Sequence, residues 1–97
     1  ENAVRVQSHL LNSTTRKYEI FGQIFFSSSE KFFQFFDFNE FVDHVIIDLT
    51  HAHIWDITSV SMLNQVQNKF LQNNIQVEII GMNEASRSLV DQYSAVK

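Results

Sequence analysis

Apolar and polar residues alternate in two segments at the start of the chain. From Val4 to Leu10, apolar or small residues take every second position, which is the period of a half-buried strand. We therefore expect a strand over residues 3–11. A polar stretch interrupts the pattern before it resumes over residues 18–26, where a second strand, the hairpin partner of the first, is expected.

A phenylalanine-rich segment follows. Ser27 and Glu30 have the spacing of a capping box, in which the two side chains satisfy free amides at a helix start. A helix is therefore expected from this point to about Phe41. Its phenylalanines occupy more than one face, so the rings either pack in the core, as aromatics usually do, or leave an exposed docking face. The candidate docking residues are Phe32, Phe33 and Phe36.

The next three elements alternate between strand and helix. The short apolar run of residues 44–49 suits a central strand that is covered on both faces and ends near Asp48. Residues 58–72 place apolar side chains at helical spacing and predict a second helix. The alternation over residues 75–79 predicts a fourth strand, which Gly81 closes.

The last helix is expected to begin at a cap formed by Asn83. Its predicted apolar stripe consists of Ala85, Leu89, Tyr93 and Val96. The element order is then β-β-α-β-α-β-α. The fold class that this order predicts is a single α/β domain with a mixed β-sheet, in which an opening hairpin precedes parallel strands with right-handed crossovers and helices packed against the sheet.

Composition narrows the functions that this domain could have. With 97 residues, 44% hydrophobic and 19% charged, the chain suffices for one globular domain. It has no cysteine, so thiol catalysis and thiolate metal sites are excluded. The net charge of -4 and the scattered basic residues argue against nucleic acid as a partner. No apolar run approaches the roughly 20 residues that span a bilayer, and the start at Glu1 instead of Met suggests either a piece of a longer protein or a processed start.

The densest polar cluster, residues 48–59, joins the expected third strand to the second helix, at the sheet edge where α/β proteins usually bind ligands. His51 and His53, together with Asp48 or Asp56, could offer a metal three ligands, but the spacing matches no zinc pattern, and hydrogen-bonded loop histidines are the simpler interpretation. A hydrolase would pair a hydroxyl with a histidine base, but no nucleophile elbow is present. We therefore predict no catalytic residue, no metal and no cofactor.

Thr58 and Ser59 lie at the start of the second helix, where free amides and the helix dipole would stabilise a phosphate. Phosphorylation there would add about two negative charges beside Asp56 and change a partner surface by repulsion. The simpler interpretation is N-capping by Asp56 or Thr58, without regulation.

The segment Val45–Val60, with the run His-Ala-His-Ile-Trp-Asp, resembles the strand-loop-helix core of STAS domains, and specifically the branch found in SulP-family anion permeases. The segments 18–27 and 81–86 resemble the second strand and the final strand-to-helix turn of the same family. The resemblance therefore covers nearly the whole chain, and the fold that it implies agrees with the pattern of elements.

In the anti-sigma-factor antagonists of this family, the equivalent loop resembles Asp-Ser-Ser-Gly, whose second serine is phosphorylated to release a partner. Here the corresponding residues are Asp56-Ile57-Thr58-Ser59, so Thr58 takes the phosphoacceptor position. Ile57 and Ser59 depart from the pattern, which weakens a phosphorylation switch for this chain.

The resemblance implies a non-catalytic regulatory domain at the C-terminus of a secondary transporter for sulfate, bicarbonate or a related anion, on the cytoplasmic face of the plasma membrane. The partners that it implies are the membrane domain, a second copy, and a regulatory protein or nucleotide. The expected interaction surface is His51, His53 and Trp55, and the regulatory positions are Asp56, Thr58 and Ser59. The alternatives are a free-standing anti-sigma-factor antagonist and, last, a small enzyme or metal protein.

Overall fold

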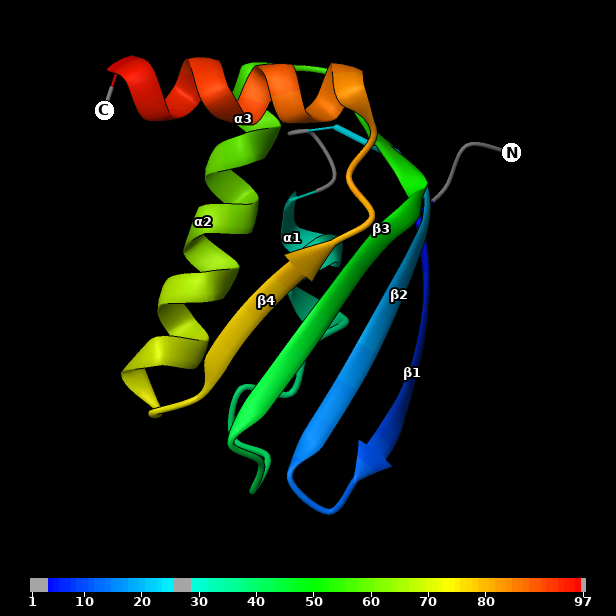
Figure 1. The fold of residues 1–97 in the computed structure, drawn as a ribbon, viewed down its shortest axis with the longest axis vertical. Helices are drawn as coiled ribbons and strands as arrows, with labels where there is room; N and C mark the ends of the chain where they lie inside the picture. The colour runs from blue at the N-terminus through cyan, green and yellow to red at the C-terminus, as the bar shows by residue number, and fades with distance from the viewer. Residues whose placement is uncertain (1–3, 26–28, 97) are drawn as a thin grey trace.

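A computed structural model of the chain describes residues 4–25 and 29–96. The elements are β1 (Arg5–Asn12), β2 (Thr15–Ile24), α1 (Ser29–Gln34), β3 (His44–Ile54), α2 (Ile57–Gln72), β4 (Gln76–Ile80) and α3 (Glu84–Val96). The strands lie side by side in the order β1-β2-β3-β4 (Figure 1). β1 is antiparallel to β2, and β3 is parallel to both β2 and β4. The predicted fold class and element order, including the opening hairpin, are confirmed.

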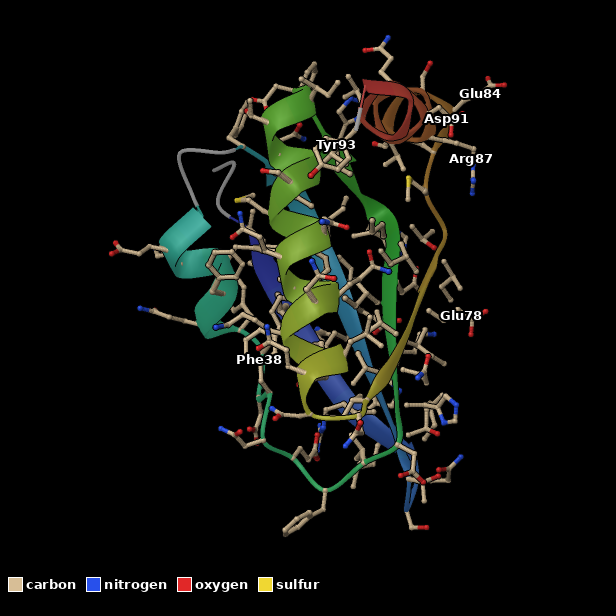
Figure 2. The ribbon with its side chains drawn as sticks, turned by 90° about the vertical axis from the view of Figure 1, so that its left-hand side faces the viewer. Phe38, Glu78, Glu84, Arg87, Asp91 and Tyr93 are labelled. Atoms are coloured by element: carbon tan, nitrogen blue, oxygen red, sulfur yellow. The ribbon has the colours of Figure 1, made fainter. Side chains whose placement is uncertain are left out.

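The helices α1 and α2 cover one face of the sheet, while α3 crosses the carboxyl ends of the parallel strands (Figures 1 and 2). Along β3 the burial alternates, with Val45, Ile47 and Leu49 in the core and the residues between them partly exposed. The prediction that this strand is covered on both faces is therefore wrong. Among the described residues, helices bury one face of the sheet, and the opposite face, here called the open face, carries mostly polar side chains.

β3 is longer than its apolar run predicted, because it pairs with β2 as far as Ile54 rather than ending near Asp48. The register slips once, since Glu19 pairs with Asp48 and Phe21 with His51, so that one residue of β2, Ile20, faces two residues of β3. This bulge keeps Ala52 and Ile54 on the buried side, in phase with the apolar residues before it. His51 and His53 consequently belong to the strand, not to a loop.

α1 is shorter than predicted, since it ends at Gln34 instead of continuing to Phe41. After it, the amides of Phe35 and Phe36 bond to the carbonyl oxygens three residues earlier, and the amide of Asp37 donates to the Tyr18 hydroxyl at 3.1 Å. These bonds turn the chain toward the sheet. The expected capping partner, Ser27, lies outside the described residues.

The phenylalanines predicted as a docking face belong mainly to the core. Phe32 is 1% exposed, Phe36 is 7% exposed, and Phe33 is partly buried against them. The ring of Phe36 packs against Tyr18 and Phe70 with centroid distances of 4.8 and 6.0 Å. The docking face is therefore wrong for Phe32 and Phe36, because the sheet and α2 need these rings to fill the space between them.

The helices α2 and α3 bury the faces that their sequences predict, except that on α3 one buried position differs by one residue. The predicted apolar residues of α2 are all buried, namely Val60, Leu63, Val66 and Phe70. On α3, Leu89 and Tyr93 pack against the core as expected, but Ala85 is exposed and Ser86 is buried in its place. The side chain of Val96 lies outside the described part of the structure.

Gly81 closes β4 as predicted, and its backbone requires glycine. Its φ is +76°, a conformation that other residues adopt only with strain. A Cβ at this position would also lie 2.1 Å from the Thr50 hydroxyl and 2.7 Å from an Asp48 carboxylate oxygen. The end of β4 therefore approaches the bulge of β3 too closely for any side chain.

Two phenylalanines with opposite exposure test this assignment of the core. We expect Phe36→Ala to lower the free energy of unfolding by about 3–5 kcal/mol, because it opens a cavity among packed rings. Phe41→Ala, at a ring that is 100% exposed, should change it by less than about 0.5 kcal/mol. Urea unfolding of both variants, followed by circular dichroism, measures the difference. Equal losses in the two variants would contradict the assignment.

Candidate functional site

The site is built around the turn between β3 and α2, where Asp56 is the N-cap of the helix. Its backbone is extended, with φ -144° and ψ 159°, as a cap residue requires. One oxygen, Oδ1, accepts hydrogen bonds from the Ser59 amide at 2.8 Å, the Ser59 hydroxyl at 2.5 Å and the Thr58 hydroxyl at 2.9 Å. The predicted capping by Asp56 is thus confirmed, and a single carboxylate fixes the first helical turn.

The two hydroxyl residues of this turn have opposite surroundings. Ser59 is 0% exposed, and its hydroxyl lies between Asp56 and the carbonyl oxygen of Ile24, 3.3 Å away at the end of β2. Thr58 is exposed, and its side chain touches the cap from the solvent side. Of the two predicted regulatory hydroxyls, only that of Thr58 is therefore open to a modifying enzyme.

The charge of Asp56 is stabilised by the same bonds. The Ser59 hydroxyl, and to a smaller extent the Ser59 amide and Thr58 hydroxyl, lower the pKa of Asp56, while burial opposes them. The carboxylate therefore stays ionised at neutral pH.

A row of aromatic side chains extends from this turn along the open face of the sheet. Trp55 stacks on Phe25 with a centroid distance of 6.4 Å, contacts His53 at 4.3 Å, and donates its indole N–H to the Gln23 side chain. One pair further along the strands, the rings of Phe21 and His51 are stacked, 5.2 Å apart and within 3° of parallel. Arg5 of β1 lies over Phe21, 5.3 Å from its centroid.

The structure thus brings together His51, His53 and Trp55, the residues predicted as an interaction surface, although two of them sit on a strand. Phe21 and Phe25 complete the same surface, and sequence reasoning missed them. Their signal was present, because Phe21 lies on the polar side of the alternation in β2, where a large apolar residue is out of place.

Hydrogen bonds that the sequence did not indicate join this site to the start of α3. The side-chain oxygen Oδ1 of Asn83 accepts from the Ser86 amide at 2.8 Å, which confirms the predicted cap, and the buried Ser86 hydroxyl accepts from the amide of Ile54 at 3.0 Å. The Asn83 side chain also lies 3.3 Å from Nδ1 of His53. The start of α3 is therefore fixed to the last residues of β3, and no periodicity in the sequence indicates this.

The geometry offers little to catalysis or to a metal. Thr58 and Ser59 direct their hydrogen bonds to Asp56 and to a backbone carbonyl, not to a histidine base. Within residues 4–25 and 29–96, no three histidine, aspartate or glutamate residues are grouped so that they could hold a metal ion. What the site does present is an exposed hydroxyl beside an aromatic surface, which suits binding.

A hollow of about 140 Å³ lies between α2, β4 and α3. Its walls are mainly apolar and include Val60, Leu63, Ile79 and Met82, with the amide side chains of Asn64 and Gln67 beside them. None of the residues predicted as functional lines it.

The fold and the site define a small α/β domain that presents aromatic side chains and an exposed hydroxyl at the carboxyl end of β3. The family model of the STAS domain matches residues 4–97, and the chain belongs to the STAS domain family. No helix in the described part of the chain is both long and apolar enough to cross a membrane.

Two kinds of relatives are similar to this chain. It is 37% identical over 89 residues to the protein called "Putative sulfate transporter YbaR" of Bacillus subtilis (strain 168). The match covers 92% of this chain but only 19% of that protein. It is 44% identical to the antisigma-factor antagonist STAS domain from Rhodobacter sphaeroides, whose crystal structure matches this fold with a TM-score of 0.81. That match covers 91% of this chain and 98% of the other. The SulP transporter STAS domain from Vibrio cholerae shares the fold, at 24% identity, a TM-score of 0.67 and coverage of 91% and 69%.

The cap at Asp56 predicts a defined pH dependence. The pKa of Asp56 is lowered in the folded state, so the unfolded state binds its proton more readily. The stability from this carboxylate is therefore present above the ordinary aspartate pKa of about 3.9 and is lost as the pH falls through the folded value. We expect Asp56→Ala to lower the free energy of unfolding by about 1 kcal/mol at pH 7, and by less in acid.

Urea unfolding at neutral and acid pH measures this change. The variant Asp91→Ala removes an exposed carboxylate from α3 (Figure 2) and is the matched control. A loss from Asp56→Ala that is the same at both pH values would show that the ionised carboxylate is not what stabilises the turn.

Proposed function

We propose that the chain is the non-catalytic regulatory and interaction domain of a SulP-type secondary transporter for sulfate, bicarbonate or a related anion. The observation that carries the proposal is its 37% identity to YbaR over 92% of this chain, a match that takes up only 19% of YbaR. A domain of this kind would be attached to a much larger membrane protein, at its C-terminus and on the cytoplasmic face of the membrane. Its partners would then be the membrane domain, a second copy of itself, or a regulatory protein or nucleotide.

The site supports regulation by contact. Asp56 and Ser59 are committed to fixing the start of α2, so the surface around them is rigid. Trp55 and Thr58 are exposed on that rigid base, and an exposed tryptophan with a fixed indole is well suited to anchor a partner. A charge placed on Thr58 would lie two residues from the ionised Asp56 and three from Trp55, so it would change the same surface by repulsion.

The second candidate function is that of a free-standing anti-sigma-factor antagonist, which binds and releases a protein under the control of a kinase. Two observations favour it, namely the 44% identity to the Rhodobacter sphaeroides domain and the exposed hydroxyl of Thr58. Against it, Ile57 and the buried Ser59 replace the small residues of the phosphorylation loop.

Transport by the full-length parent protein tests the first proposal. We expect Trp55→Ala to change the transport rate without changing the amount of protein in the membrane, because an exposed anchor contributes to contacts and not to the core. Tryptophan anchors at interfaces are typically worth about 2 kcal/mol, so the contact should weaken by about thirtyfold. Leu71→Ala, another exposed apolar side chain, is the control. A transport rate that is unchanged when the whole domain is deleted would contradict the proposal.

Phosphorylation separates the two candidates. When the purified domain is incubated with an extract of the source cells and labelled ATP, we expect no stoichiometric labelling of Thr58, since its neighbours depart from the loop of the antagonists. Mass spectrometry locates any phosphate, and Thr58→Ala shows whether it depends on that residue. Complete labelling of Thr58 together with release of a bound protein would favour the antagonist instead.

A further inference from the structure

The hollow between α2, β4 and α3 is apolar although it opens to solvent. Two of its residues, Val60 and Leu63 of α2, are buried. Ile79 of β4, Met82 of the β4–α3 turn and Val90 of α3 are only half-buried, so apolar surface there still touches water. An apolar molecule that displaces this water removes the surface from solvent, which is favourable. The hollow is therefore suited to an apolar occupant.

The arrangement of the two long helices explains why this space exists. α2 runs along the strands, whereas α3 crosses their ends, so the two helices lie side by side only over a short stretch (Figure 1). Tyr93 of α3 is directed toward α2 (Figure 2) and forms part of the wall. Ile79 of β4 forms another part. The hollow thus follows from the way in which the two helices cross.

The volume of the hollow sets the size of the molecule that fits. A cavity of about 150 Å³ lined by leucine, isoleucine and phenylalanine stays dry and binds benzene, whereas sites for drug-sized ligands measure roughly 300–1,000 Å³. At about 140 Å³, the hollow accommodates a single ring. Met82 and Tyr93 favour an aromatic one, since thioether and aromatic side chains make favourable contacts with aromatic rings.

The lining determines the charge of the molecule. None of the residues that line the hollow, all of them in the described part of the chain, is a lysine, arginine, histidine, aspartate or glutamate. Glu84, Arg87 and Asp91 project from the side of α3 away from α2 (Figure 2). A carboxylate, sulfate or phosphate group in the hollow would lose its hydration without gaining a charged partner, which is costly. The occupant is therefore uncharged, and the hollow does not suit the anions of the proposed transporter.

Two amide side chains give the hollow a polar wall. Asn64 and Gln67 are three residues apart on α2, so they lie on the same face of the helix. Within the described part of the chain, neither side-chain amide makes a hydrogen bond to another residue. Each amide carries both donors and an acceptor. A hydroxyl group on the bound ring would consequently find a partner there.

We propose that the hollow binds a small uncharged phenol, that is, one aromatic ring with one hydroxyl group. The ring lies among the apolar side chains, and the hydroxyl bonds to the amide of Asn64 or Gln67. A docked peptide helix would need a continuous groove for anchors spaced over two turns, whereas this hollow takes a single ring. The inference is independent of the proposed function, because it holds equally for a transporter domain and for a free-standing one.

Titration of the ¹⁵N-labelled chain with phenol, followed by NMR, tests the site. We expect saturable binding with a dissociation constant of about 1 mM or below, since very small ligands reach the highest affinity per atom. The largest shifts should fall on the side-chain amides of Asn64 and Gln67 and on the backbone amide of Met82. Benzoate, which has the same ring but carries a charge, should bind at least about tenfold more weakly.

Two asparagines of α2 provide matched variants. Asn64→Leu keeps the size of the side chain but removes its hydrogen bonds, so it should weaken phenol by about fivefold relative to toluene, which has the shape of phenol without the hydroxyl. Asn68→Leu, at an exposed position outside the hollow, should change neither ligand. Shifts that do not saturate, benzoate that binds as tightly as phenol, or equal effects of the two variants would overturn the site.

Discussion

The parallel pairing of β3 with β2 on one side and β4 on the other is the constraint on which the rest of the structure depends. Because β3 lies between two strands, its backbone is bonded along both edges, and its buried side chains, such as Val45, Ile47 and Leu49, face the helices. The bulge between Asp48 and His51 keeps Ala52 and Ile54 in phase with the residues before it. The strand therefore reaches the start of α2 without exposing its apolar side. Parallel strands end at one edge of the sheet, so the ends of β2 and β3 lie beside the first turns of α2 and α3.

Two kinds of polar and aromatic residues lie at that edge: some make the hydrogen bonds that join strands to helices, and others are exposed to solvent. Hydrogen bonds that join strands to helices are made by Asp56, Ser59 and Ser86. Thr58 and Trp55, which sit beside them, are exposed. A change at Thr58 therefore alters charge and shape at the surface, and of the three hydrogen bonds to the Asp56 carboxylate it removes only the one from the Thr58 hydroxyl.

The sequence predicted the parts of the fold that depend on local periodicity. The strand–helix order and the buried face of α2 follow from the spacing of residues such as Val60 and Phe70, and the caps at Asp56 and Asn83 follow from residue type. The errors arose where tertiary contacts override local pattern. α1 stops early because Tyr18 accepts the amide of Asp37, from a strand far away in sequence. The histidines of β3 looked like loop residues, since the pairing that extends the strand to Ile54 comes from β2. The exposed aromatic row and the Ser86 contact depend on which residues face each other across strands, and one strand's own sequence does not determine that.

The central claim is that this chain works as part of a much larger membrane protein. The most direct measurement uses an antibody against the domain on fractionated source cells, to read the size and the compartment of the native protein that contains it. The account predicts one band, several times larger than the 11.3 kDa of this chain, in the membrane fraction. A band near 11 kDa in the soluble fraction would contradict it.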